Sequence, residues 1–159
     1  VDDLPPTDLG VAPHSPDPRV SVYLMEYLRR SSSRGFASRV APLRYDVIEG
    51  YYPILTNRLS DEDITVRAAT VSALRFAADD RVAAELFAAA VDDGRLPERE
   101  RLLALKLAGA WAEEQTAAAM RSHVEDADTA VANAARIGIA HAEQMAERRR
   151  FWFGAEAVR

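Results

Sequence analysis

Three histidines and five pairs of carboxylates are the side chains of this sequence that could perform acid–base or metal chemistry. The histidines, His14, His123 and His141, are too far apart along the chain to give a local metal-ligand spacing. The carboxylate pairs are Asp61/Asp63, Asp79/Asp80, Asp92/Asp93, Glu113/Glu114 and Asp126/Asp128. All five fall at predicted helix ends, where acids cap backbone amides, so we expect capping rather than general acid–base catalysis.

Other catalytic scaffolds are missing from the 159 residues. The absence of cysteine removes disulfides, Cys-ligated zinc, iron–sulfur clusters and thiol nucleophiles. The seven glycines form no phosphate loop, dinucleotide-binding motif or nucleophile elbow. For His141, we expect stabilisation of the end of a helix by the protonated ring, with catalysis as the alternative. We therefore assign no catalytic, metal-binding or cofactor-binding residue.

The charge distribution bears on the class of partner. The net charge is −5, and residues 61–142 hold 15 acids and 9 bases. Nucleic-acid binders usually present a basic face, so this acidic segment argues against nucleic acid as the partner. No stretch approaches 18 consecutive apolar residues, which argues against an integral membrane protein. The first residues show no signal peptide, and the sequence thus predicts a cytoplasmic protein.

Composition and periodicity predict an all-α chain. Alanine occupies 30 positions, and no alternating run is long enough for a strand. Residues 1–17, rich in proline, are predicted to be an extended arm, followed by an extra N-terminal helix that begins at Pro18. Residues 18–142 form the predicted helical domain, in which Pro53 kinks a helix, and residues 143–159 form a separate Arg/aromatic segment.

Apolar residues spaced three and four apart predict which face of each helix is buried. The predicted stripes are Ile64, Ala68, Val71, Leu74 and Ala78, then Val82, Leu86 and Ala89, then Leu103, Leu107 and Ala110, widened by Leu102, Leu105 and Trp111, and finally Val131, Ala134, Ala135, Gly138 and Ile139. The third of these helices is expected to be covered on both sides. Asp79-Asp80 is expected to end the first helix, and Gly94 to take the left-handed position after the second.

The helices recur in pairs. Val66, Glu100 and Val131 align at spacings of 34 and 31, each near the start of an Ala/Leu-rich helix. Two helices per period of this length are typical of an α-solenoid, in which stacked units bury a continuous core. The sequence predicts a short solenoid of about three helix pairs, at approximately residues 43–78, 79–112 and 113–142.

The segment LSDEDITVRAATVSAL, residues 59–74, resembles the HEAT repeat. In that pattern an outer helix ends in leucine, an Asp-containing turn follows, and Val-Arg opens the inner helix. The Pro53 kink is also similar to that of the family's outer helix. The later repeats are degraded, because Glu100-Arg101 and Val131-Ala132 replace Val66-Arg67. The resemblance implies first a protein-binding scaffold, and as minority activities a DNA glycosylase or a bilin lyase.

Arg67 has a structural interpretation that does not depend on the family. It follows Asp61 by six residues, one turn into the predicted helix, and can fold back onto Asp61 and Asp63. We expect these three residues to stabilise the turn rather than to catalyse a reaction.

The C-terminal segment is the candidate binding site. Three arginines and three consecutive aromatic residues cannot all face one side of an amphipathic helix. The candidates for partner binding are Arg148, Arg149, Arg150, Phe151, Trp152 and Phe153. A cap folded over the last repeat and a peripheral membrane contact remain as alternatives. The sequence predicts a non-enzymatic protein–protein interaction module, as a small accessory or regulatory subunit of a larger complex, with a HEAT-like enzyme (DNA-base glycosylase or chromophore-lyase type) as the alternative.

Overall fold

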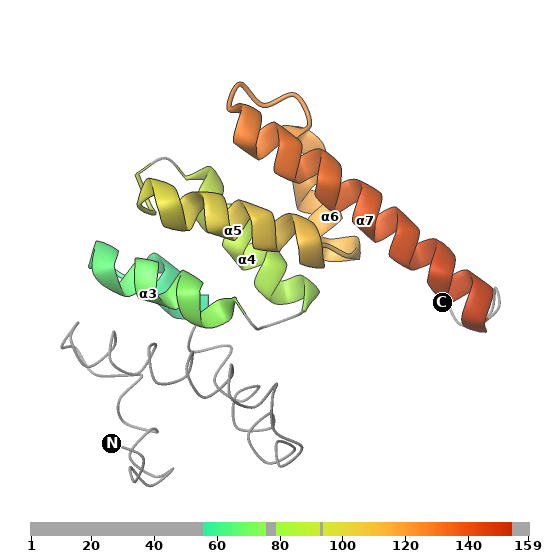
Figure 1. Ribbon diagram of the computed structural model, residues 1–159, viewed down its shortest axis with the longest axis horizontal. Coiled ribbons are helices and arrows are strands. Elements are labelled where there is room, and N and C mark those ends of the chain that lie inside the picture. Colours follow the sequence, from blue (N-terminus) through green and yellow to red (C-terminus); the bar gives the residue numbers. More distant parts are fainter. Residues whose placement is uncertain (1–55, 76–78, 93, 154–159) are drawn as a thin grey trace, which may run out of the picture. The chain divides into compact units, whose positions relative to one another are not determined.

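A computed structural model describes residues 56–75, 79–92 and 94–153 (Figure 1). Within these ranges the chain forms five α-helices and two short 3-10 helices, and no strand. The predicted all-α class is therefore confirmed for this part of the chain. The predicted proline-rich arm, the extra N-terminal helix and the kink at Pro53 lie outside the described residues.

The described residues belong to two compact units. One contains the 3-10 helix η3 (Arg58–Ser60), helix α3 (Ile64–Leu74) and residues 94–100. The other contains α4 (Asp80–Val91), most of α5 (Glu98–Trp111), α6 (Glu114–Met120), η4 (Arg121–His123) and α7 (Thr129–Phe153). Helix α5 begins in the first unit and continues in the second.

Helix α3 buries a face that is rotated from the predicted stripe. Val71 and Leu74 are buried as predicted, but Ile64 is 44% exposed. Asp63 caps this helix, which places Ile64 in its first turn, and Val66 and Thr70 are buried instead. Thr70 tolerates burial because its hydroxyl donates a hydrogen bond to the carbonyl oxygen of Val66 at 2.7 Å.

Helix α4 follows its predicted pattern, with Val82, Leu86 and Ala89 all buried. One boundary differs: Asp79 and Asp80 begin α4 rather than ending the preceding helix, and Asp79 is its N-cap. The Asp79 carboxylate accepts a hydrogen bond from the Val82 amide at 2.9 Å, which satisfies one amide of the first turn.

The buried face of helix α5 differs most clearly from the predicted apolar stripe. Leu102 is 45% exposed, Ala110 is exposed, and Leu103 and Leu107 are only half-buried. The helix is therefore not covered on both sides. Its buried residues are Arg101, Ala104, Leu105, Ala108 and Gly109. Gly94, which precedes α5, has φ +82° and so occupies the predicted left-handed position.

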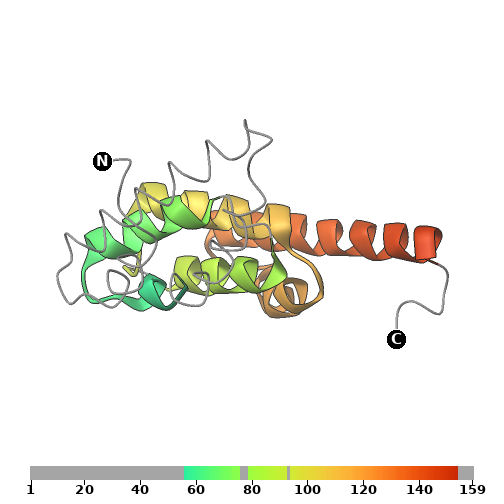
Figure 2. The same ribbon diagram turned by 90° about the horizontal axis from the view of Figure 1, so that it is seen from below.

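Helices α6 and α7 pack together, and α6 also contacts α4. The approach of α6 and α7 is close at Gly138, where an added Cβ would overlap the Met120 sulfur and lie 3.1 Å from the Cβ of Ala112. Val131, Ala134, Ala135 and Gly138 of α7 are buried as predicted, and Ile139 is half-buried. Helix α7 continues without a break through residue 142 to Phe153, and its second half extends past α6 (Figure 2).

Candidate functional site

The turn before α3 is held by side chains that bind backbone groups. Asp61 accepts from the Asp63 amide at 3.0 Å and from Arg58 at 2.8 Å, and Asp63 accepts from the Thr65 amide at 2.7 Å. Arg67 reaches this turn as predicted, but it donates to the carbonyl oxygens of Asp61 (2.5 Å) and Glu62 (3.0 Å) rather than to the carboxylates. The two carboxylates instead bind amides and Arg58, so Arg67 fastens the turn through its backbone.

The same turn recurs before α7, 65 residues later. Asp126 accepts from the Asp128 amide at 2.9 Å, and Asp128 accepts from the Ala130 amide at 2.8 Å. His123 takes the place of Arg58, and its Nδ1 donates to Asp126 at 2.9 Å. A short 3-10 helix precedes both turns. The hydrogen bond from His123 lowers the pKa of Asp126, and hydrogen bonds from Thr65 lower the pKa of Asp63.

An arginine one turn into the helix also recurs, and in each case it reaches a later turn. Arg67 Nε donates to the carbonyl oxygen of Arg95. Arg101, which is 8% exposed, donates from Nε to the carbonyl oxygen of Ala90 at 2.8 Å and from Nη2 to the Asp128 carboxylate at 2.5 Å. The bond from Arg101 lowers the pKa of Asp128. The two arginines span 28 and 27 residues, and each ties one helix to the turn that precedes a later one.

Asp80 connects two helices through one carboxylate. Its Oδ1 accepts from the amides of Glu113 (2.8 Å) and Thr116 (3.1 Å), and its Oδ2 accepts from the Gln115 amide (2.8 Å). The N-cap residue of α6, Glu113, makes no side-chain capping bond, so Asp80 supplies the cap from α4. Partial burial raises the pKa of Asp80, but hydrogen bonds from Thr116, Glu113 and Gln115 outweigh it and hold the pKa below its usual value.

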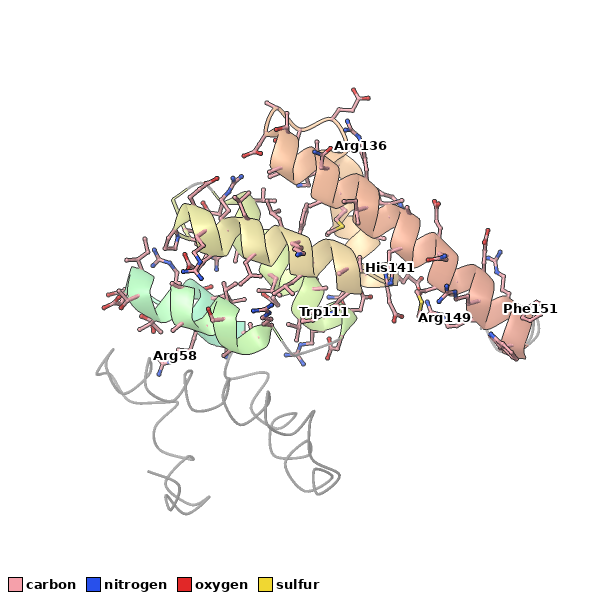
Figure 3. All side chains as sticks on the ribbon, in the orientation of Figure 1. Arg58, Trp111, Arg136, His141, Arg149 and Phe151 are labelled. Carbon is pink, nitrogen blue, oxygen red and sulfur yellow. The ribbon has the colours of Figure 1, made fainter. Side chains whose placement is uncertain are left out.

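His141 differs from its predicted position. It lies in the middle of α7 rather than at a helix end, and its Nδ1 donates to the carbonyl oxygen of Ala112 at 2.8 Å. Ala112 follows the last residue of α5, so His141 satisfies a carbonyl at the end of a different helix. Figure 3 shows His141 on α7 between Arg136 and Arg149.

In three of the five carboxylate pairs, Asp61/Asp63, Asp79/Asp80 and Asp126/Asp128, the carboxylates accept hydrogen bonds from backbone amides. Within residues 56–75, 79–92 and 94–153, no group of three or more His, Asp or Glu side chains is placed to hold a metal ion. In the same ranges, no helix has the length and apolar character needed to cross a bilayer.

Comparisons with known proteins identify no relative. No protein family, curated protein or solved structure matches this chain. The candidate site therefore rests on its own geometry.

The end of α7 carries the most exposed large apolar side chains of the described residues. Phe151 is 81% exposed and Trp152 is 74% exposed, and their rings meet edge to face with centroids 5.4 Å apart. Phe151 lies at the far end of the helix (Figure 3). Phe153 ends the helix. Both rings are thus mostly exposed rather than packed against the described helices.

The three arginines next to these rings differ in their surroundings. Arg149 is half-buried and forms an ion pair with Glu113, the residue before α6. Arg148 and Arg150 are exposed, and neither has an ion-pair partner among the described residues. The predicted binding segment therefore divides into one arginine that fastens α7 to the fold and two that face solvent.

Sequence reasoning missed Glu113, Asp80 and Arg101 as connecting residues. Glu113 and Asp80 were visible only as members of acidic pairs, and their partners lie 36 and at least 33 residues away. The only sequence signal for the role of Arg101 was its alignment with Arg67 in the repeat comparison. Trp111, which was predicted to widen the apolar stripe of α5, is half-buried.

Proposed function

We propose that this chain is a non-enzymatic protein–protein interaction module that binds a partner through the carboxyl end of α7, as a small accessory or regulatory subunit of a larger complex. The observation that carries the proposal is the adjacent exposed pair Phe151 and Trp152, which are 81% and 74% exposed. Covering a large apolar side chain contributes about 1.5–3 kcal/mol. Trp and Arg are also the residue types that most often dominate binding energy at protein interfaces.

The proposed architecture is a short HEAT-like solenoid. The repeated Asp turns before α3 and α7, 65 residues apart, support this because 65 residues is twice a period of about 33, which is within the range of helical repeats. The arginines Arg67 and Arg101, each bound to a later turn, support it further. Ala132, the aligned residue of the third unit, has no such side chain and is buried.

Site-specific photocrosslinking tests the proposed function. The photoreactive amino acid p-benzoylphenylalanine replaces Phe151 in one protein and Ile137 in a second, in a lysate of the source organism. Ile137 is a matched control because it is 60% exposed on the same helix, fourteen residues earlier. We expect one stoichiometric crosslinked protein from position 151 and none from position 137.

A second measurement uses the double variant Phe151→Ala/Trp152→Ala. We expect it to lose the crosslinked partner while keeping the far-ultraviolet circular dichroism of the wild type. The proposal fails if crosslinking at position 151 gives only a background of many weak products, or if light scattering after purification from the lysate shows the wild-type protein alone and monomeric.

A further inference from the structure

One face of α7 passes from complete burial to exposure along its length. Val131, Gly138, Met145 and Trp152 are spaced seven residues apart and therefore lie along the same side of the helix. Val131 is 2% exposed, Gly138 is buried against Met120 of α6, Met145 is half-buried, and Trp152 is 74% exposed. The face that packs on α6 in the first half of α7 thus becomes progressively uncovered in the second half.

Two arginines, Arg148 and Arg149, lie beside the exposed part of this face. Arg149 follows Met145 by four residues and binds the carboxylate of Glu113. Arg148 precedes Trp152 by four residues, one helical turn, so the two side chains are neighbours on the helix surface. Arg148 is exposed and has no ion-pair partner among the described residues. Glu113, the N-cap residue of α6, therefore already binds Arg149, whereas Arg148 remains available.

We propose that the face of α7 formed by half-buried Met145 and exposed Arg148 and Trp152 binds an acidic amphipathic helix of a partner protein. The inference deepens the proposed function and rests on it. A carboxylate of the partner would pair with Arg148 as Glu113 pairs with Arg149, and apolar residues one turn away would cover Trp152 and Met145. The binding mode follows the contact that α6 already makes with the first half of the same face.

The charge of Arg148 favours an acidic occupant of this face, in contrast to the rest of the chain. The chain carries a net charge of −5, and residues 61–142 hold 15 acids against 9 bases. An acidic partner is repelled by most of this surface and attracted at Arg148, which directs it to this face at the end of α7. A basic partner would instead meet the unpaired guanidinium group of Arg148 on this face.

The observations favour a protein over a lipid surface. Membrane-bound amphipathic helices need a long apolar face. Here Phe151 and Trp152 point about 100° apart around the helix, and exposed acids at Glu143 and Glu147 lie on the same segment. The apolar area offered to a bilayer is therefore small and lies beside negative charge.

Selection from a random peptide library tests the proposal while the partner is still unidentified. Random 20-residue peptides displayed on phage are selected on the full wild-type chain, with parallel selection on Trp152→Ala to remove peptides that bind elsewhere. We expect the enriched peptides to combine Asp or Glu with Leu, Ile or Phe at helical spacing. One enriched peptide is then synthesised, and its affinity is measured by fluorescence anisotropy.

Charge reversal at two positions identifies the contact. Arg148→Glu should weaken binding of the selected peptide about tenfold or more, the loss expected when one close charge pair becomes repulsive. Arg136→Glu makes the same charge change at an exposed position in the first half of α7 and should weaken binding less than twofold. Raising sodium chloride from 50 to 300 mM should weaken binding to the wild type and have less effect on Arg148→Glu.

The outcomes separate this inference from the proposed function. Enriched peptides that are neutral or basic, that need Trp152 but bind Arg148→Glu and Arg136→Glu equally, would overturn the acidic-partner proposal and leave an interaction module. Enrichment that does not depend on Trp152 would overturn both. The acidic-partner proposal also fails if the protein binds phosphatidylcholine vesicles with 30% phosphatidylserine and the peptide does not compete, or if Trp152-dependent self-association occupies the face.

Discussion

The carboxylate of Asp80 caps a helix to which it does not belong: its Oδ1 lies 2.8 Å from the amide nitrogen of Glu113, at the start of α6. Asp80 is itself the first residue of α4. One side chain therefore satisfies amides of α6 and joins the beginnings of two helices that are 33 residues apart in sequence. Short α6 has only seven residues, too few for a stable isolated helix, so it depends on this contact and on packing.

The first prediction concerns this contact. Asp80→Ala removes the acceptor of three amides and should lower the free energy of unfolding by about 1–2 kcal/mol, the range found for helix caps. Urea denaturation followed by circular dichroism measures the change. Glu85→Ala, an exposed acid on the same helix, is the control and should change stability by less than about 0.5 kcal/mol. Equal effects of the two variants would contradict the capping role.

The second prediction concerns Arg101, whose side chain is 8% exposed and bridges Ala90 and Asp128. Arg101→Met keeps most of the apolar stem but removes both hydrogen bonds, and should destabilise the fold by about 2–3 kcal/mol, as for buried bonds from a charged donor. Arg99→Met, at an exposed position of α5, should have little effect on the urea midpoint. If the two variants have the same midpoint, the bridge does not stabilise the protein.

The third prediction compares two glycines in helices. At Gly138 an added methyl group would overlap buried Met120 and crowd Ala112, so Gly138→Ala should destabilise by about 1–3 kcal/mol despite its better helix propensity. At Gly109 the nearest atom, the carbonyl oxygen of Ala134, would be 3.3 Å away; this tight contact offsets the gain in helix propensity, so Gly109→Ala should be close to neutral. Thermal denaturation measures both. Adding Met120→Ala should make the Gly138→Ala substitution less costly, and additive effects would argue against the predicted clash.

The fourth prediction concerns pH. Hydrogen bonds lower the pKa values of Asp63, Asp80, Asp126 and Asp128 below the usual 3.8 in the folded protein. Because the pKa is lower in the folded state, these carboxylates stabilise the fold above about pH 4, and that contribution is lost as the pH falls through the lowered values. The unfolding free energy in urea should therefore be lower at pH 2.5 than at pH 7. Asp128→Asn should reduce the difference, and a stability that is equal at both pH values would contradict the assignment.

The fifth prediction separates a surface role from a structural role for the terminal aromatic residues. Phe151→Ala/Trp152→Ala removes two rings that are mostly exposed, so the unfolding free energy should change by less than about 0.5 kcal/mol per residue. Calorimetry gives the midpoint. A large decrease in thermal stability would show that the rings cap the fold, and the interaction proposal would lose its main support.

Local sequence signals determined which segments are helices and where several of them begin. Asp63 and Asp128 are capping residues that each bind amides of the first turn of the following helix, and this depends only on neighbouring residues. Asp79 caps α4 in the same way, although the sequence pattern predicted that it ends the preceding helix. The left-handed conformation at Gly94 is local in the same sense. Exposure of Phe151 and Trp152 agrees with the sequence argument that this segment cannot face one side of a helix.

Only the tertiary structure decided which side chains turn inward and which partners they find. Hydrophobic periodicity predicted that Leu103 and Leu107 lie in the core, but Arg101 and Ala104 are buried instead. Burial of Arg101 is possible because its guanidinium group donates hydrogen bonds to Ala90 and Asp128. The carbonyl that binds His141 and the amides that bind Asp80 are likewise distant in sequence. Periodicity is a property of one helix, whereas burial and long-range hydrogen bonding depend on which helix lies beside it.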